Sequence, residues 1–369
     1  MKYSLPAWGV AVAGLGLLIG NAAVIAHAGL ISPEAVKRDG TITIPSFDLP
    51  YSEYGSPEAR DLMVRRFMGP QAQGPTPDIA VGRKAVDDMI FRPTAEGHAR
   101  AYPYISNKGR IAGVSVETFV PKAGIAPENK ERILINLHGG GFIVGTGGLA
   151  GAAESIPIAG IGRIRVIAVD YRQAPEYAFP AASEDVAAVY RELLKTYRPK
   201  NIGIYGCSSG GMLVGQSIAW FLKEKLPLPG AIGVLCSSLN GPGGDSQQIW
   251  SRMGSYNRDL PPSTPVAVFE TPYLAGQSRS NPLVVPAASK DVMRQFPPTI
   301  FVTGSRSAEM SSAATSHNEL LDLGVKSQLV VVDGMEHGFY NDVLPEAALA
   351  HRLVVRFMME NLGKEGRGR

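Results

Sequence analysis

The sequence predicts an α/β fold in which helices flank a mostly parallel central sheet. Short apolar runs alternate with amphipathic segments over most of the chain, and such alternation is typical of βαβ units. Several of these runs are apolar at successive positions, as expected for strands that are buried on both faces. At 369 residues, the chain is long enough for one large domain of this class or two smaller ones.

Composition excludes several classes of protein. A hydrophobic content of 45% excludes a disordered chain, and a net charge of +3 without a basic stripe gives no indication of a nucleic-acid partner. The only cysteines, Cys207 and Cys236, are too few for a disulfide framework or a cysteine metal site. We expect two buried free thiols, with a single bridge as the alternative.

The first 28 residues have the pattern of a secretory signal peptide. Lys2 provides a positive start, residues 7–19 are apolar and uncharged, and Ala26-His27-Ala28 forms a small-residue cleavage site. We expect cleavage after Ala28 and an exported protein, either periplasmic or secreted. The apolar stretch 5–26 is also about long enough to span a bilayer. The alternative is therefore an uncleaved anchor that holds the rest of the chain outside the cytoplasm, with membrane association through the N-terminus.

The remaining chain divides by composition into four parts. Residues 29–100 are rich in proline, glycine and charge, and within them 57–68 has an amphipathic helical pattern. Residues 101–239 and 297–369 carry the alternating strands and helices. Between them, 240–296 is proline-rich without a clear strand, and we interpret it as an insertion over the carboxyl ends of the strands, where such sheets bind ligands.

The individual elements follow from hydrophobic periodicity. One half-exposed strand is predicted at 114–120, and buried strands are predicted at 132–137, 165–169, 201–205, 231–235, 299–303 and 328–332. Helices are predicted at 183–197, 209–223, 311–323 and 345–362. Ser183 is the expected N-cap of the first of these, because two acidic residues follow it in the first turn.

A serine lies at a turn between a predicted strand and a predicted helix. The sequence Gly-Cys-Ser-Ser-Gly at 206–210, which we call the nucleophile elbow, has the G-x-S-x-G pattern with Ser208 at its apex. Such a turn is so tight that the positions two before and two after the serine must be glycine or nearly so. A plain glycine-rich turn is the alternative, but the flanking strand and helix favour a nucleophile.

A serine nucleophile also needs a base and donors for an oxyanion. The sequence His-Gly-Gly-Gly-Phe at 138–142, which we call the glycine loop, follows a predicted strand. The backbone N–H groups of Gly140, Gly141 and Ser209 would provide three oxyanion donors. His337 follows the last predicted strand and is the candidate base. His138 is expected to brace its own loop.

These motifs together resemble the hormone-sensitive-lipase family of α/β-hydrolases. The resemblance covers residues 100–362 and is carried by four motifs in the right order: 138–142, 170–176, 206–211 and 336–339. It implies a serine carboxylesterase that acts on small-molecule esters with short or medium acyl chains, without a cofactor. The sequence indicates no metal site and implies no protein partner. It also implies a cap built from 29–100 and 240–296, and a structural role for the charged turn 170–176. Aromatic residues of the insertion could line an acyl pocket or form the core of the cap: Trp250, Tyr256, Phe269 and Tyr273.

Two positions depart from the family pattern. Cys207 stands directly before the nucleophile, where the family usually has aspartate. Ser307 stands where the family has its catalytic aspartate, and Glu309 lies two residues further on. We predict Glu309 as the acid that orients His337, since glutamate is chemically adequate for this role. Asp333 is the reserve candidate, and a dyad without an acid is the remaining alternative.

Two other functions stay open at the level of sequence. An amidase or arylformamidase would use the same catalytic groups on a different bond. A catalytically degenerate binding protein of the same fold would use the capped pocket for a ligand, and the departure at Ser307 is its support. Retention of the serine, the histidine and the glycine loop favours the esterase.

Overall fold

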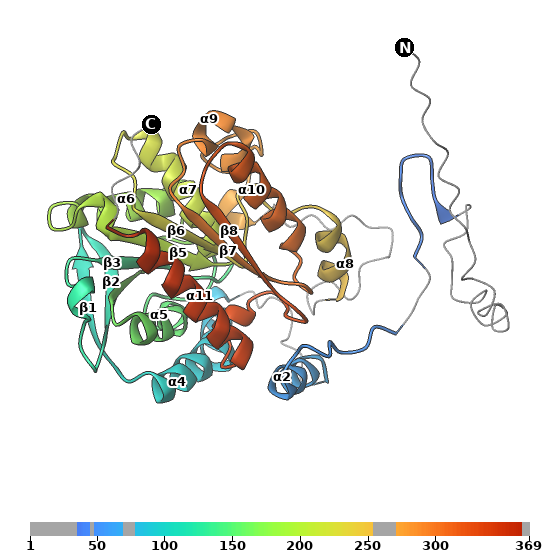
Figure 1. Ribbon diagram of the computed structural model, residues 1–369, viewed down its shortest axis with the longest axis horizontal. Coiled ribbons are helices and arrows are strands. Elements are labelled where there is room, and N and C mark those ends of the chain that lie inside the picture. Colours follow the sequence, from blue (N-terminus) through green and yellow to red (C-terminus); the bar gives the residue numbers. More distant parts are fainter. Residues whose placement is uncertain (1–34, 45–47, 69–77, 254–270, 364–369) are drawn as a thin grey trace, which may run out of the picture. The chain divides into compact units, whose positions relative to one another are not determined.

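The computed structural model describes residues 35–44, 48–68, 78–253 and 271–363 (Figure 1). The chain divides into two compact units, Met1–Pro50 and Tyr51–Arg369. In the first unit, the described residues include a turn closed by a bridge between Val36 and Ile42. The predicted signal segment 1–28 lies outside the described residues. Within the described ranges, no helix combines the length and the apolarity needed to cross a bilayer.

An eight-stranded sheet forms the centre of the second unit (Figure 1). The strand order is β1-β2-β4-β3-β5-β6-β7-β8. β1 and β2 pair antiparallel, β2 pairs antiparallel with β4, and the remaining strands are parallel. The strands are β1 Tyr104–Ile111, β2 Val114–Pro121, β3 Ile133–Leu137, β4 Arg165–Val169, β5 Ile202–Cys207, β6 Ala231–Leu235, β7 Thr299–Gly304 and β8 Ser327–Val332.

Helices cover both faces of this sheet because the side chains of each central strand alternate between two cores. Ile133, Ile135 and Leu137 of β3 pack into one apolar cluster with α6, α7 and α10. Leu134 packs into the other, with α5 and α11. The α-helices are α2 Pro57–Met68, α3 Ile79–Val86, α4 Arg92–Ala101, α5 Ala150–Gly162, α6 Ala181–Leu193, α7 Ser209–Lys223, α8 Asp245–Met253, α9 Lys290–Met293, α10 Met310–Asp322 and α11 Pro345–Asn361.

Most predicted elements are present, and the differences have physical causes. The seven predicted strands correspond to β2–β8, but β1 was not predicted, because this edge strand is mostly exposed and lacks an apolar alternation. Helix α5 was also not predicted. Almost all of its residues are buried and it contains Pro157, so no amphipathic stripe marks it in the sequence.

The predicted N-cap at Ser183 is wrong. Helix α6 begins two residues earlier, at Ala181, with Pro180 in the cap position. Ser183 is therefore inside the first turn and fully buried. The predicted insertion 240–296 contains α8 and α9 in its described part, and residues 254–270 lie outside the described residues.

Candidate active site

Ser208 lies at a sharp turn between β5 and α7, at the carboxyl edge of the sheet. Its backbone has φ 61° and ψ −124°, a conformation that side-chain-bearing residues rarely adopt and that is typical of a nucleophile elbow. The flanking glycines are required by close packing. A Cβ atom at Gly206 or Gly210 would lie only 2.1 or 1.8 Å from the carbonyl oxygen of Leu137. The turn that presents Ser208 can form only with glycine at these two positions.

Ser208, His337 and Glu309 form one row of hydrogen bonds. The Oγ of Ser208 is 3.0 Å from Nε2 of His337, and Nδ1 of His337 is 2.9 Å from Oε2 of Glu309. The three residues follow β5, β8 and β7, whose carboxyl ends meet at the same edge of the sheet. The side chain of Glu309 is 10% exposed and that of His337 is 50% exposed. The row thus runs from a buried carboxylate to a solvent-accessible serine.

Glu309 is surrounded by groups that favour its charged form. Burial would raise the pKa of Glu309, but the charge and hydrogen bond of His337, with a further hydrogen bond from Ser307, hold it below its usual value. Desolvation lowers the pKa of His337, and the charge and hydrogen bond of Glu309 outweigh this and raise it. Ser307, at the position where the family pattern has aspartate, is fully buried and donates a hydrogen bond to Oε1 of Glu309.

The reserve acid, Asp333, is engaged elsewhere. Its carboxylate accepts hydrogen bonds from the hydroxyl groups of Ser52 and Ser305, the latter at 2.8 Å. These two hydrogen bonds lower the pKa of Asp333. Of the two candidate acids, the structure brings Glu309, and not Asp333, to His337.

The glycine loop lies directly beside the nucleophile elbow. A Cβ atom at Gly139 would lie 3.4 Å from Cβ of Ser208. Gly140 and Gly141 have φ of +128° and +65°, and no acceptor among the described residues binds their backbone N–H groups. Ser209 is the first residue of α7, so its N–H has no partner within the helix. Among the described residues, these three N–H groups, the predicted oxyanion donors, thus have no protein acceptor.

Known proteins share this fold and are similar to this chain in sequence. The family model that matches residues 134–341, more than half of the chain, describes the alpha/beta hydrolase fold. The chain belongs to the hormone-sensitive-lipase-like family of α/β-hydrolases. A solved esterase from the bacterial hormone-sensitive lipase family has a TM-score of 0.66 and 25% sequence identity, and the match covers 84% of this chain and 99% of that one. The predicted fold class and family are therefore confirmed.

Two relatives are named as acetyl-hydrolases. An acetyl-hydrolase of Streptomyces hygroscopicus is 26% identical over 254 residues, which cover 63% of this chain and 77% of that protein. A protein of Mycobacterium tuberculosis named as an acetyl-hydrolase is 34% identical over 129 residues, which cover 34% of this chain and 40% of that protein. These names agree with the predicted enzyme class, a carboxylic ester hydrolase.

Cys207 differs from the aspartate of this family and is not placed to react. Its side chain is completely buried, and burial, together with the neighbouring Cys236, raises the pKa of its thiol well above the usual value. Both cysteines are free, which confirms the predicted pair of buried thiols. His138 is also buried, and its Nδ1 is 2.8 Å from the carbonyl oxygen of Gly139, as expected for a residue that braces its own loop.

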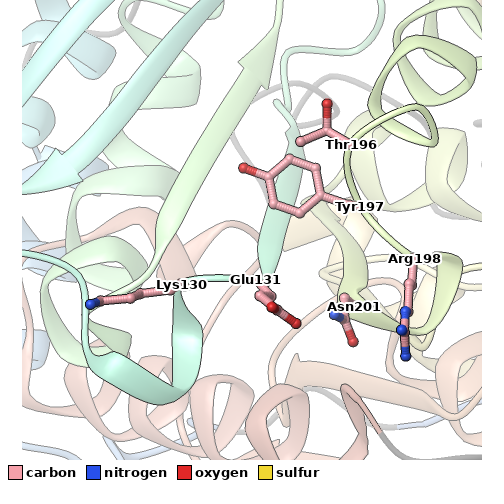
Figure 2. Close-up of a pocket in the computed structure, with 6 residues that line it drawn as sticks. All are labelled: Lys130, Glu131, Thr196, Tyr197, Arg198 and Asn201. Atoms are coloured by element: carbon pink, nitrogen blue, oxygen red, sulfur yellow. The ribbon is translucent and has the colours of Figure 1, made fainter.

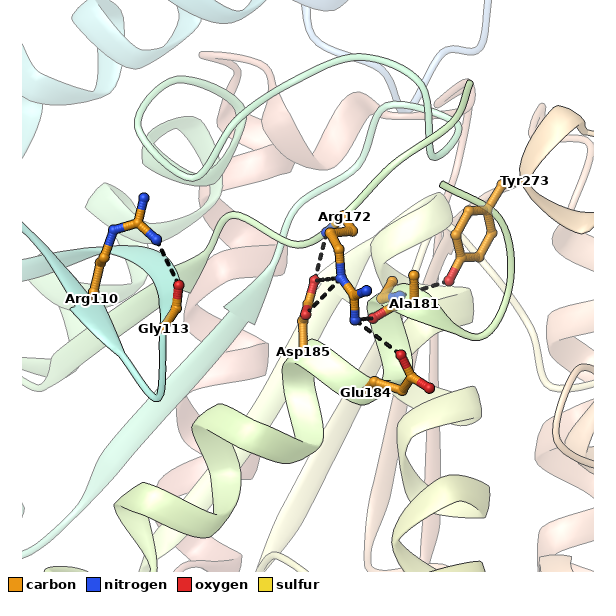
Figure 3. A network of polar contacts seen from close by, with 8 residues as sticks. Arg110, Gly113, Arg172, Ala181, Glu184, Asp185 and Tyr273 are labelled. Carbon is orange, nitrogen blue, oxygen red and sulfur yellow. Dashed lines mark hydrogen bonds and ion pairs between the residues drawn. The ribbon is translucent and has the colours of Figure 1, made fainter. Parts of the chain in front are cut away.

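The charged turn 170–176 has the structural contacts that the family resemblance implied. Arg172 binds both carboxylate oxygens of Asp185 and one of Glu184 (Figure 3). Glu176 forms a two-point ion pair with Arg83 of α3, and Arg83 also donates to the carbonyl oxygen of Ile143, directly after the glycine loop. Sequence reasoning did not identify Arg83, because an isolated arginine in an amphipathic helix gives no signal of its partners.

The aromatic residues of the insertion are only partly placed. Tyr273 is completely buried: its ring stacks on Phe142 at 4.5 Å, and its hydroxyl accepts a hydrogen bond from the N–H of Ala182. Tyr273 is therefore core and does not line a pocket. Trp250 is half-buried. Tyr256 and Phe269 lie outside the described residues.

A hollow of about 300 Å³ lies elsewhere on the molecule (Figure 2). It is lined by Lys130, Glu131, Thr196, Tyr197, Arg198 and Asn201. These residues precede β3 or β5, whereas the glycine loop and Ser208 follow the same strands. The hollow is therefore at the amino ends of the strands, opposite to the carboxyl ends where Ser208 lies. Within the described ranges, no three His, Cys, Asp or Glu side chains are grouped to hold a metal ion.

Proposed function

We propose that this protein is an exported serine carboxylesterase that cleaves short- to medium-chain esters through an acyl-enzyme. The observation that carries the proposal is the hydrogen-bonded row from Glu309 through His337 to Ser208, with two distances of 2.9 and 3.0 Å. A nucleophile, a base and an acid in this geometry form a catalytic triad. The names of the relatives support an ester as the bond that is cleaved.

In the proposed reaction, Oγ of Ser208 attacks the ester carbonyl while Nε2 of His337 accepts the serine proton. The N–H groups of Gly140, Gly141 and Ser209 form an oxyanion hole for the tetrahedral intermediate. When the C–O bond breaks, His337 returns the proton to the leaving alcohol and the acyl group stays on Ser208. Water, deprotonated by His337, then attacks the acyl-enzyme and forms a second tetrahedral intermediate. When its bond to Oγ breaks, the carboxylic acid leaves and His337 returns the proton to Oγ of Ser208.

Throughout the cycle, Glu309 holds the other ring nitrogen of His337. Its carboxylate keeps the imidazole in the tautomer that can accept the serine proton, and its charge stabilises the imidazolium that forms. Contacts from Ser307 and Thr303 fix the carboxylate itself.

Labelling with a serine-directed organophosphonate tests the proposal. We expect one phosphonate per folded molecule, attached to the peptide that contains Ser208, and no label on a Ser208→Ala variant. Absence of label from the folded wild-type protein would remove the mechanism and leave the ligand-binding protein of the same fold.

Substrate class is tested by turnover. The acetyl-hydrolase names of two relatives support short acyl chains, so we expect p-nitrophenyl acetate and butyrate to be cleaved faster than the decanoate. Formyl-anilides should be poor substrates. Faster turnover of the anilides would instead assign the protein as an amidase or arylformamidase.

Export rests on the sequence of residues 1–28. We expect a periplasmic or secreted protein that begins at Gly29, or, if the segment is retained, a membrane-anchored one with its catalytic part outside the cytoplasm. Fractionation with N-terminal sequencing distinguishes the two. An intact N-terminus found only in the cytoplasmic fraction would contradict both.

A further inference from the structure

Glu154 is a completely buried carboxylate that lies behind the active site on α5. Three N–H donors converge on it. Its Oε1 accepts a hydrogen bond from the backbone N–H of Gly139 at 2.9 Å. Its Oε2 accepts one from Nδ2 of Asn136 at 2.8 Å and one from the backbone N–H of Cys207 at 3.2 Å. No motif in the sequence points to this residue.

The two backbone donors belong to the two halves of the site. Gly139 directly precedes Gly140 and Gly141, whose N–H groups are the proposed oxyanion donors. Cys207 directly precedes Ser208, whose backbone is held at an unfavourable positive φ. A single carboxylate therefore binds the peptide before the oxyanion donors and the peptide before the nucleophile.

We propose that Glu154 is a positioning residue of the esterase site, and that its carboxylate fixes the spacing between the glycine loop and the nucleophile elbow. This role rests on the proposed function. The oxyanion hole stabilises the transition state only if its donors lie at hydrogen-bonding distance from the oxygen that develops charge on the acyl group bound to Ser208. A misplacement of about 1 Å can lower the rate about 100-fold.

The negative charge on Glu154 is stabilised by hydrogen bonds from neutral N–H groups and not by a cation. None of the ion pairs found among the described residues includes Glu154. Burial raises the pKa of Glu154 to about 7, although the hydrogen bonds from Asn136, Gly139 and Cys207 each lower it. The titratable groups that face it are all acids that burial keeps neutral near this pH: Tyr171, Tyr205, Tyr340 and Cys207.

Ionised Glu154 has two acceptor oxygens, whereas glutamine has one acceptor oxygen and an NH₂ group that only donates. In Glu154→Gln, the backbone N–H of Gly139 or that of Cys207 must therefore face the NH₂ group of the glutamine, which cannot accept its hydrogen bond. We expect kcat per phosphonate-titrated active site to fall about 10- to 100-fold, with KM changed less than about threefold. A merely structural role would lower the amount of folded protein but leave kcat per titrated site unchanged.

Glu346→Gln is the matched control. Glu346 is also buried and also accepts hydrogen bonds from a backbone N–H and a side chain, but both come from Ser56, away from Ser208. We expect Glu346→Gln to retain wild-type kcat. Wild-type kcat in Glu154→Gln, or a loss that lies entirely in KM, would overturn the proposal for Glu154 while leaving the esterase intact. A wild-type protein that is not labelled at Ser208 would overturn the proposed function and this role together.

The pH dependence gives a second test that does not need Glu154 to be replaced. Protonation of Glu154 removes an acceptor, so loss of its proton should contribute to the rise of the wild-type kcat with pH, in addition to the rise that deprotonation of His337 causes. Asn136→Ala removes a donor that lowers the pKa of Glu154, so the contribution of Glu154 should move to higher pH. A kcat profile in Asn136→Ala that has the same pH dependence as the wild type would contradict the proposal.

Discussion

Two buried glutamates, Glu309 and Glu154, contact neighbours of Ser208 but differ in what surrounds them. Glu309 binds a histidine that can carry a positive charge, and its pKa is held below the usual value. Glu154 binds only neutral N–H donors, and its pKa is raised to about 7. The same side chain is therefore suited to orient and stabilise a cation in one place and to hold backbone geometry in the other.

The difference shows that burial alone does not make a carboxylate the acid of a triad. The group that is hydrogen-bonded to the carboxylate decides its role. Which group this is depends on which residues the fold brings together at the carboxyl ends of the strands. If this comparison is right, removing the charge of Glu309 should change both the rate and its pH dependence, because the pKa of His337 depends on that charge.

Glu309→Gln is expected to have the largest effect. Loss of the carboxylate leaves His337 in the wrong tautomer, and kcat should fall by about 10³- to 10⁴-fold. Because the negative charge of Glu309 raises the pKa of His337, its removal should also lower that pKa. His337 acts as a base only when neutral, so the acid limb of the kcat/KM profile should move to lower pH. If Glu309→Gln changes neither kcat nor the acid limb of the kcat/KM profile, Glu309 is not the acid that orients His337.

Ser307→Ala tests the support of Glu309 and should have an intermediate effect. Removal of the hydroxyl takes away one hydrogen bond to Oε1, while Thr303 still donates to the same atom at 3.3 Å. A hydrogen bond to a charged group contributes about 1.5–3 kcal/mol, part of which Thr303 retains, so we expect kcat to fall about 3- to 10-fold. A loss as large as that of Glu309→Gln would indicate that Ser307 itself acts on His337.

Asp333→Asn should have the smallest effect on activity. The carboxylate binds Ser52 and Ser305, and an asparagine oxygen can still accept from one of them. We expect kcat within about twofold of wild type and at most a slightly lower melting temperature. A loss of more than about 100-fold would make Asp333 the acid and contradict the role given to Glu309.

The sequence was sufficient for the features that are local. Buried strands such as 231–235 are continuous apolar runs, and G-x-S-x-G between a strand and a helix places Ser208 directly. The candidate acid is marked in the sequence by a departure from the family pattern: Glu309 lies two residues after the usual position. In the structure its carboxylate is hydrogen-bonded to His337 and Ser307.

Contacts between distant segments could not be predicted. Glu154 lies in a helix that has no apolar stripe, and its partners are mainly backbone N–H groups, which every residue but proline possesses. Strand β1 was missed because its residues are exposed at the sheet edge. In each case the burial pattern or the partner is set by tertiary packing, which single-sequence periodicity does not record.

Trapping the acyl-enzyme tests the central claim most directly. A p-nitrophenyl butyrate reaction would be quenched with acid within the first turnover, and the digested protein mapped by mass spectrometry. The account predicts a butyryl group on the peptide that spans 206–210, assigned by fragmentation to Ser208 and absent from Ser208→Ala. A butyryl group on Cys207, or turnover without any acylated peptide, would contradict it.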